Sequence, residues 1–193
     1  MNSFFALLFR QKYIMRWSLM RNTTNESLSE HTAEAAMIAH ALAVIGNTVF
    51  GKQYDADRIA ALALYHDASE VLTGDLPTPI KYFSPAMKQE YTEIEARAIE
   101  QLLTKLPAEL RDTYAALLSG KESDPDAYRL VKIADKLCAY IKCLTEEAGG
   151  NREFLAARRT IEAELNAIES EELAYFREHF LEAFSLTIDE IQS

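Results

Sequence analysis

The sequence is short of cysteine, glycine and proline, and this scarcity narrows the class of protein. Its 193 residues include two cysteines, six glycines and five prolines, so we expect neither a disulfide framework nor a collagen-like or low-complexity chain. Cys138 and Cys143 lie five positions apart in one predicted helix, so their side chains diverge and are too distant to bridge. With 49% hydrophobic and 26% charged residues, the chain has the composition of an ordinary globular protein.

Positively charged residues are also few. Lys and Arg number 20 against 30 Asp and Glu, which gives a formal net charge of −10. A surface of this sign repels a polyanion, so we expect no binding to nucleic-acid polymers. A small anionic ligand is still compatible with the sequence, because a few Arg and Lys around a bound cation can be positive inside an acidic protein.

Long apolar runs are missing as well. No stretch is expected to approach the roughly 20 apolar residues of a membrane span. The run from Phe4 to Phe9 is shorter than a signal-peptide core and has no basic segment before it. We therefore expect no membrane partner and, together with the scarce cysteines, a cytoplasmic location.

The apolar residues recur at helical spacing and almost nowhere alternate as in a half-buried strand, so the predicted fold is all-α. A chain of this length can bury roughly two-thirds or more of its unfolded surface in one core, and residues 1–193 are predicted to form a single domain. Ser27 followed by Glu30 is a capping-box pattern that predicts a helix start. The sequence from Gly74 to Pro79 predicts a short, stiff loop. The predicted helices cover about residues 3–12, 27–49, 57–72, 84–102 and 123–148, with another segment from Pro107 and two amphipathic helices after Gly150.

Two histidines are expected to point inward from different helices. His31 shares a helix face with Leu42, at an offset of 11 residues, and so faces the core. His66 follows Ile59 and Leu62 on the apolar stripe of its own helix. A single inward histidine is more often a hydrogen-bonded core residue than a metal ligand, and that alternative applies to each of them alone.

Two aspartates complete a possible metal-binding set. Asp67 is turned about 100° from His66 around the same predicted helix and can reach a shared cation from the side. Asp135 lies between Val131 and Cys138 on an apolar stripe, where an isolated carboxylate is costly unless a cation or strong donors compensate it. Two imidazoles and two carboxylates suit Mn, Co, Fe, Ni or Zn better than Ca, and they leave room for water and a substrate oxygen.

The sequence around these residues resembles a known family. The pattern of His31, His66-Asp67 and Asp135 is similar to the H…HD…D signature of the HD phosphohydrolase superfamily, which implies a compact helical bundle of the HD-domain type. Four segments narrow the resemblance to the bacterial 5′-deoxynucleotidases of the YfbR type: residues 16–22, 29–31, 65–82 and 134–140. The similarity covers nearly the whole chain.

The resemblance implies a metal-dependent phosphomonoesterase that removes phosphate from deoxyribonucleoside 5′-monophosphates, usually as a homodimer. Its cofactor would be one divalent transition metal, Co or Mn, with Zn, Ni, Cu and Fe as alternatives. The implied ligands of this metal are His31, His66, Asp67 and Asp135.

Glu70 is the implied proton-transferring residue. It lies four residues after His66, which the prediction places one helical turn along the same face. A carboxylate there can orient or deprotonate the attacking water and later assist departure of the 5′-oxygen. Without the resemblance, a solvated helix residue is an equally good interpretation.

Arg16 and Lys81 are the implied phosphate ligands, and Arg16 is also counted as catalytic. A guanidinium and an ammonium can neutralise negative charge as it redistributes in the transition state. Lys81 follows the turn at residues 77–79, which can offer backbone donors to a ligand. Without the resemblance, both cations would be taken for ordinary surface residues. The other implied substrate contacts are Trp17, Asp75, Thr78, Pro79, Ile80 and Asp135.

Selectivity for deoxyribose is a further hypothesis. Trp17, beside Arg16, would crowd the 2′ position of the sugar, and Asp75 would accept a hydrogen bond from its 3′-hydroxyl. Trp17 as a plain core residue is the competing interpretation.

Two other functions stay open at this stage. The same four metal ligands would serve another HD hydrolase, such as a cyclic-nucleotide phosphodiesterase or a nucleoside triphosphate hydrolase. A non-catalytic helical module that binds a nucleotide or a partner is the second alternative, although the presence of Glu70, Arg16 and Lys81 argues against it.

Overall fold

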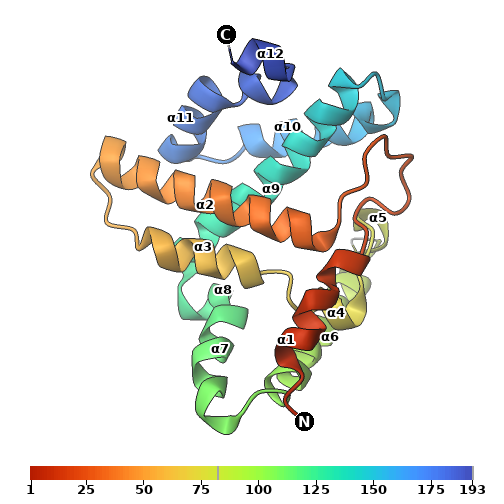
Figure 1. Cartoon of the computed structure of the whole chain (residues 1–193), viewed down its shortest axis with the longest axis vertical. Helices are drawn as coiled ribbons and strands as arrows, with labels where there is room; N and C mark the ends of the chain where they lie inside the picture. Colours follow the sequence, from red (N-terminus) through yellow and green to blue (C-terminus); the bar gives the residue numbers. More distant parts are fainter. Residues whose placement is uncertain (82, 193) are drawn as a thin grey trace.

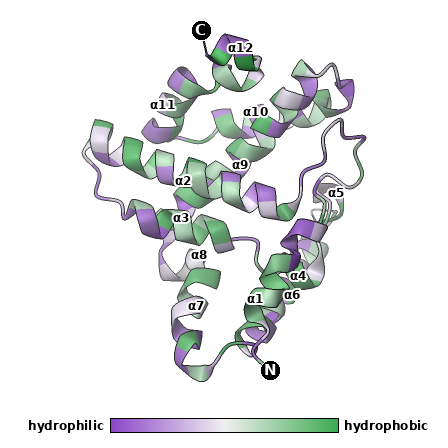
Figure 2. Cartoon of the chain, viewed as in Figure 1, coloured by the Kyte–Doolittle hydropathy of each residue, from purple (hydrophilic) through white to green (hydrophobic). Residues whose placement is uncertain are grey.

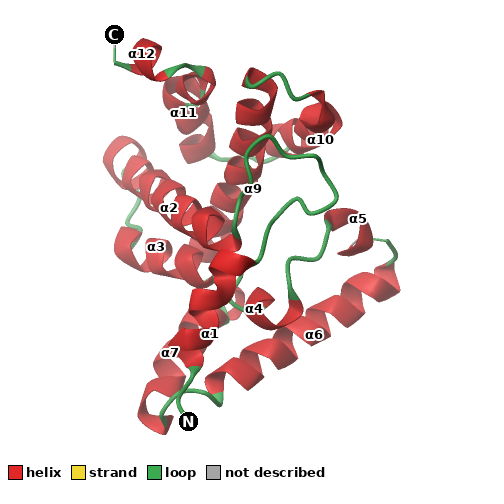
Figure 3. Cartoon of the chain, turned by 45° about the vertical axis from the view of Figure 1, so that its right-hand side comes forward, coloured by secondary structure: helices red, strands yellow, loops and turns green. Residues whose placement is uncertain are grey.

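The computed structural model describes residues 1–81 and 83–192, so Tyr82, the last residue of the 65–82 motif, lies outside the described residues. Within the described part, every regular element is a helix, and the one β-type contact is an isolated antiparallel bridge between Met15 and Ser27. Figure 3 shows helices joined by loops throughout. The predicted all-α class is confirmed.

Three helices form the centre of the fold: α2 (Leu28–Phe50), α3 (Ala56–Tyr65) and α9 (Pro125–Ala148). Helices α2 and α3 lie side by side, and both pack on α9, which crosses behind them (Figure 1). Buried aliphatic residues from all three join in one hydrophobic cluster. Burying each such side chain contributes about 1.5–3 kcal/mol, so this junction is the main stabilising contact of the fold. Figure 2 shows hydrophobic residues recurring along these helices, with hydrophilic ones between them.

The remaining helices cover the two ends of this centre. Helix α10 (Leu155–Asn166) packs on α9, and α11 (Glu171–Phe180) packs on α2, at the end where the C-terminus lies (Figure 1). At the other end, α1 (Phe4–Leu8) joins α6 (Pro85–Leu103) and α7 (Arg111–Leu118) around a second, smaller apolar cluster. The short elements are η1 (Phe9–Tyr13), α4 (Glu70–Thr73), α5 (Thr78–Lys81), η2 (Ala108–Leu110), α8 (Gly120–Ser123), η3 (Arg152–Phe154), η4 (Glu182–Ser185) and α12 (Ile188–Ile191).

Helix α2 begins at the predicted capping box. The Ser27 hydroxyl accepts a hydrogen bond from the Glu30 amide at 3.2 Å, and the Ser27 amide donates to the Glu30 carboxylate at 2.7 Å. The helix ends at Gly51, whose φ of +67° is the left-handed conformation that glycine adopts without strain. This start fixes the orientation of His31, which lies in the first turn.

The expectation that no stretch approaches a membrane span is wrong for α2 when only length and composition are considered. Its mean hydropathy reaches 1.4, because it is rich in alanine and aliphatic residues. The core helix of a soluble protein passes the same test. In this fold the buried stripe of α2, which includes Ala35, Ala39 and Leu42, packs in the central cluster against α3 and α9.

The predicted helix over residues 57–72 is interrupted at the His-Asp pair. Helix α3 ends at Tyr65, residues 66–69 form turns, and α4 begins at Glu70. Two hydrogen bonds of the i to i+3 type hold the turns, from the Ala68 amide to the Tyr65 carbonyl at 3.1 Å and from the Glu70 amide to the Asp67 carbonyl at 3.0 Å. Glu70 therefore does not follow His66 along one continuous helix face, as the sequence predicted.

The predicted loop at residues 74–79 is shorter than expected. Gly74 ends α4 with a φ of +75°, but residues from Thr78 onward form the one-turn helix α5. The amides of Ile80 and Lys81 both donate to the Pro77 carbonyl, at 2.8 and 3.1 Å. Pro79 is compatible with this turn because a proline is tolerated in the first turn of a helix.

Candidate active site

Two fully buried imidazoles face each other where α2 and α3 meet. The side chains of His31 and His66 are 0% exposed, and their ring centroids are 5.3 Å apart. His31 comes from the first turn of α2, and His66 caps the C-terminal end of α3. The structure therefore brings together two histidines that are 35 positions apart in the sequence.

Two carboxylates approach both imidazoles. An oxygen of Asp67 lies 3.6 Å from His31 Nε2 and 3.1 Å from His66 Nε2. An oxygen of Asp135, from α9, lies 3.3 Å from His31 Nε2 and 3.9 Å from His66 Nε2. Ligand atoms that share one ion at bond lengths of about 2.1 Å are about 3.0–3.4 Å apart. The spacing therefore suits a shared cation, and ligand atoms of His31, His66 and Asp67 all lie within 4.8 Å of one another.

The protonation of His66 is set by its own helix. Its Nδ1 lies 2.6 Å from the Ala63 carbonyl oxygen, and a carbonyl can only accept, so Nδ1 carries a proton and Nε2 is the nitrogen that can bind a metal. This contact occurs at the turn of residues 66–69, where the imidazole donates to a carbonyl oxygen at the end of α3. His66 Nε2 is thereby aimed at the carboxylates.

The donor set fits a divalent transition metal. Within the part of the chain that the structure describes, neither His31 Nε2 nor His66 Nε2 makes a hydrogen bond, although each faces two carboxylates. A lone pair beside a carboxylate is repulsive unless a cation lies between them. Burial alone would lower the pKa of His66, but Asp67 and Asp135 raise it to about 10, so the arrangement favours positive charge at this point.

The aspartates are held ionised. Burial would raise the pKa of Asp67, but His66 and His31 lower it well below its usual range. The pKa of Asp135 is likewise lowered against the effect of burial, first by Lys132 and then by the two imidazoles. Both carboxylates are thus available as anionic ligands across the whole physiological pH range.

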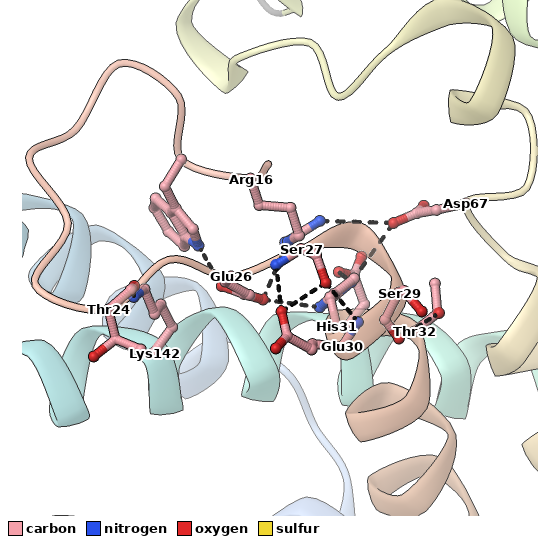
Figure 4. A network of polar contacts seen from close by, with 12 residues as sticks. Arg16, Thr24, Glu26, Ser27, Ser29, Glu30, His31, Thr32, Asp67 and Lys142 are labelled. Carbon is pink, nitrogen blue, oxygen red and sulfur yellow. Dashed lines mark hydrogen bonds and ion pairs between the residues drawn. The ribbon is translucent and has the colours of Figure 1, made fainter. Parts of the chain in front are cut away.

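Arg16 reaches this group from the loop that precedes α2. Its Nη1 lies 3.7 Å from Asp67 Oδ2, and its Nε lies 3.3 Å from Glu26 Oε1 (Figure 4). Burial would lower the pKa of Arg16, but Asp135 and Asp67 outweigh it and raise the pKa. A permanent cation therefore lies next to the candidate metal ligands.

Glu70 is buried, with 5% of its surface exposed. One of its carboxylate oxygens makes no hydrogen bond to any described residue. Burial, followed by repulsion from Asp67 and Asp75, raises the pKa of Glu70 to about 9. The side chain thus has the raised pKa that is typical of a proton-transferring carboxyl group.

Asp75 and Lys81 lie close enough to Glu70 for their charges to act on it. Asp75 is half-buried, and burial raises its pKa against the attraction of Arg16. Lys81 Nζ lies 2.9 Å from Glu95 Oε1 and 4.4 Å from the centre of the Tyr91 ring, both on α6. Lys81 is therefore paired with α6 in this structure, and Thr78, Pro79 and Ile80 are exposed on α5.

Trp17 adopts an unusual backbone conformation beside Arg16. Its φ of +57° is the one positive value at a non-glycine residue in the described chain, and such a conformation is strained for a bulky side chain. The indole Nε1 donates to Glu26 at 2.9 Å, and the ring packs edge-on against Phe154 with centroids 5.3 Å apart. Trp17 is half-buried, so it is neither a plain core residue nor a free surface one.

Two residues near the site were not predicted from the sequence. Lys132 pairs with Asp135 from one turn earlier on α9, and the i, i+3 spacing of opposite charges was a usable signal. Glu26 contacts Arg16, Trp17 and His31. It lies in an irregular segment before α2, where no periodic pattern points to it.

The chain matches a family model and several named proteins. The model described as 5′-deoxynucleotidase YfbR-like matches residues 3–184. A 5′-deoxynucleotidase of Vibrio cholerae is 52% identical over 97% of this chain and 97% of its own length. The 5′-deoxynucleotidase YfbR of Escherichia coli is 54% identical over 97% of this chain and 94% of its own length.

Solved structures share the fold at lower identity. An HD-domain phosphohydrolase from Listeria innocua superposes with a TM-score of 0.83 at 22% identity, over 98% of this chain and 91% of that one. The HD phosphohydrolase DatZ of cyanophage S-2L, solved with dA and one catalytic Zn²⁺ ion, gives a TM-score of 0.61 at 20% identity, over 92% of this chain and 95% of that one. With the extent of the family match, these likenesses lead to one conclusion: the chain belongs to the YfbR-like 5′-deoxynucleotidase family and has the fold of the HD-domain phosphohydrolases.

Proposed function

We propose that this chain hydrolyses deoxyribonucleoside 5′-monophosphates to deoxynucleosides and inorganic phosphate with the help of one divalent metal ion. The observation that carries the proposal is the convergence of two imidazoles and two carboxylates from α2, α9 and the turn that follows α3, beside the half-buried guanidinium of Arg16. The names of the relatives from Vibrio cholerae and Escherichia coli supply the substrate class.

The metal would be held by His31, His66, Asp67 and Asp135. Their mixed nitrogen and oxygen donors favour Co or Mn, with Zn, Ni, Cu and Fe as alternatives. When bound, such an ion polarises a phosphate oxygen and lowers the pKa of a bound water. The buried nitrogens His31 Nε2 and His66 Nε2 face the two carboxylates and make no hydrogen bond to any described residue, which supports this assignment.

Arg16 and Lys81 would bind the phosphate. Arg16 already lies 3.7 Å from Asp67, so its guanidinium can share a phosphate with the metal group. Lys81 is paired with Glu95, and it would exchange that partner for the substrate. Both cations would then stabilise the charge that develops on the phosphoryl oxygens.

Glu70 would move the proton. A water oxygen attacks phosphorus, the bond from phosphorus to the 5′-oxygen breaks, the protonated Glu70 carboxyl group donates its proton to the leaving 5′-oxygen, and the resulting carboxylate takes up the proton lost by the water. Its buried environment and raised pKa support a role in holding a proton near neutral pH.

Trp17 and Asp75 would recognise the sugar. Trp17 would crowd the 2′ position, and Asp75 would accept a hydrogen bond from the 3′-hydroxyl. The hydrogen bond that fixes the Trp17 indole to Glu26 supports a rigid wall at this position. Thr78, Pro79, Ile80 and Asp135 would complete the contacts to the substrate.

We further propose that the chain acts as a one-domain homodimer in the cytoplasm. Its two cysteines are free and buried, as suits a reducing compartment. Exposed aromatic residues gather in the first segment, where Phe9 is 73% and Tyr13 is 64% exposed, and such surfaces are common at subunit contacts. Sedimentation equilibrium measures the state, and a monomer across the concentration range would contradict the dimer.

One experiment tests the proposed activity. The purified chain is stripped with a chelator, single divalent metals are restored, and phosphate release is measured from deoxynucleoside and ribonucleoside 5′-monophosphates. Hydrolysis of the deoxy substrates that depends on metal is expected. Activity only on cyclic diesters or triphosphates would favour a different HD hydrolase, and binding without any hydrolysis would favour a non-catalytic module.

A further inference from the structure

Glu26 lies where the loop that carries Arg16 meets the start of α2. It is buried, with 8% of its surface exposed. Backbone hydrogen bonds fix its position, because the Arg16 amide donates to the Glu26 carbonyl at 2.9 Å and the Leu28 amide donates to the Ile14 carbonyl at 2.8 Å. The Glu26 side chain therefore extends from a segment whose backbone is hydrogen-bonded to the loop that carries Arg16.

Three side-chain nitrogens lie close to the single carboxylate of Glu26, and one of them, the Trp17 indole, donates a hydrogen bond to it. The Trp17 indole donates to Oε2 at 2.9 Å, while Arg16 Nε and His31 Nδ1 lie 3.3 and 3.6 Å from Oε1 (Figure 4). Arg16 Nε and His31 Nδ1 are both buried and make no hydrogen bond within the described residues. An ionised carboxylate has about four acceptor positions, so Glu26 can accept from all three.

The carboxylate of Glu26, 3.6 Å from His31 Nδ1, favours a proton on that nitrogen. If Nδ1 carries its proton toward Glu26, the lone pair of Nε2 is directed at Asp67 and Asp135, whose oxygens lie 3.6 and 3.3 Å away. In the other imidazole, His66 Nδ1 donates to the Ala63 carbonyl oxygen. A carboxylate behind a metal-binding histidine fixes its tautomer and raises its basicity.

The contact with Trp17 is made by the other carboxylate oxygen of Glu26, Oε2. The backbone of Trp17 is in the left-handed region, with a φ of +57°, and this conformation persists only where its surroundings hold it. Glu26 holds the indole through Nε1, and Phe154 packs against the ring. One carboxylate is thus connected both to a metal-binding residue and to the proposed wall of the sugar pocket.

We propose that Glu26 is a positioning residue that couples the tautomer of His31 to the placement of Arg16 and Trp17. The inference rests on the proposed function, because it assigns Glu26 to the metal and sugar sides of that same site. Glu26 acts only through these three neighbours. Removing its charge should therefore weaken metal binding and relax sugar selectivity together.

The test compares Glu26→Gln with Glu30→Gln. The glutamine keeps the size of Glu26 but replaces one accepting oxygen with an NH₂ group, so at least one of the three donors loses its acceptor. Glu30 is exposed and serves the capping box of the same helix. Its substitution therefore changes a nearby charge and the helix start without touching the three donors.

Calorimetric titration with Mn²⁺ alone gives the first readout. We expect Glu26→Gln to bind Mn²⁺ 10–100-fold more weakly than the wild type and to show a smaller ratio of deoxy to ribo kcat/KM, while Glu30→Gln changes neither. An Mn²⁺ affinity and a sugar ratio within twofold of the wild type in Glu26→Gln would overturn the inference.

A second measurement uses the unaltered protein, in case Glu26→Gln does not fold. ¹H NMR of the Zn²⁺-loaded wild type detects the Nδ1 proton of His31. A strong downfield shift, typical of a hydrogen bond to a carboxylate, supports the inference, and an Nδ1 proton without that shift overturns it. Neither the Mn²⁺ titration nor this spectrum depends on hydrolysis. A wild type that binds metal but is inactive would contradict the proposed function. The role of Glu26 would still be tested by these two measurements.

Discussion

The Nδ1 nitrogen of His66 donates to the carbonyl oxygen of Ala63 at 2.6 Å. This contact joins the end of α3 to the chemistry of the site, because it settles which nitrogen of His66 can bind a metal. That nitrogen, Nε2, lies 3.1 Å from Asp67 and 3.9 Å from Asp135. The backbone turn that interrupts the predicted helix is therefore part of how the site is built.

Glu70→Gln should lower kcat by 10²–10⁴-fold, the usual contribution of a positioned proton-transferring group. The amide keeps the shape of the side chain but can neither accept nor return a proton. Glu70 is not among the proposed metal ligands, so Mn²⁺ affinity should stay within a few-fold of the wild type. Phosphate release and calorimetry on the same preparation measure both quantities, and a fully active Glu70→Gln enzyme would exclude the assigned role.

The residue types of the site could be predicted from the sequence, but the turn within it could not. Nothing in residues 57–72 signals a break, because the segment contains no glycine or proline and its residues are compatible with a helix. At the interruption the His66 imidazole donates to the Ala63 carbonyl, a side-chain contact that helix propensity does not reveal. The predicted face relationship between His66 and Glu70 failed for this reason.

Glu26 was missed for a different physical reason. It lies in an irregular segment, nine residues from Trp17, so helical or strand periodicity gives no hint of its neighbours. Its place depends on the bridge between Met15 and Ser27, a tertiary contact. By contrast, His31 and Asp135 lie on long periodic helices, where an inward polar residue is visible from the sequence alone.

Trp17→Ala should admit ribonucleotides. Removing the indole opens space at the 2′ position, and a contact of this size discriminates by about 10–200-fold. The expected change is a rise in kcat/KM for ribonucleoside 5′-monophosphates, with a smaller effect on the deoxy substrates. Asp75→Asn is the matched control, because it should weaken both substrates alike through the shared 3′-hydroxyl. An unchanged sugar preference in Trp17→Ala would show that the discrimination lies elsewhere.

Glu146 should make stability depend on acid pH. Burial would raise its pKa, but hydrogen bonds from Lys142, Asn151 and the Thr23 and Thr24 amides lower it to about 2. A carboxyl whose pKa is lowered on folding stabilises the protein above its unfolded pKa of about 4.3, and this stabilisation is lost as the pH falls toward 2. The contribution is about 3 kcal/mol, measurable by urea unfolding between pH 7 and pH 2.

Glu146→Gln should remove much of that acid dependence and lower the stability at pH 7. Glu147 is a suitable control, because it is the neighbouring acid and pairs with Arg158 nearer the surface. Glu147→Gln should leave the pH profile close to that of the wild type. A wild-type stability that is flat between pH 5 and pH 3 would contradict the role of Glu146.

The most direct test of the account is a calorimetric titration of Mn²⁺ into the chelator-stripped chain, repeated on His31→Ala, His66→Ala, Asp67→Ala and Asp135→Ala. The account predicts one ion bound per chain in the wild type, and a loss of at least 10-fold in affinity in every folded variant, together with loss of phosphate release. A wild type that binds no ion, or a variant that keeps full Mn²⁺ affinity, would contradict the convergence of these four side chains on one cation.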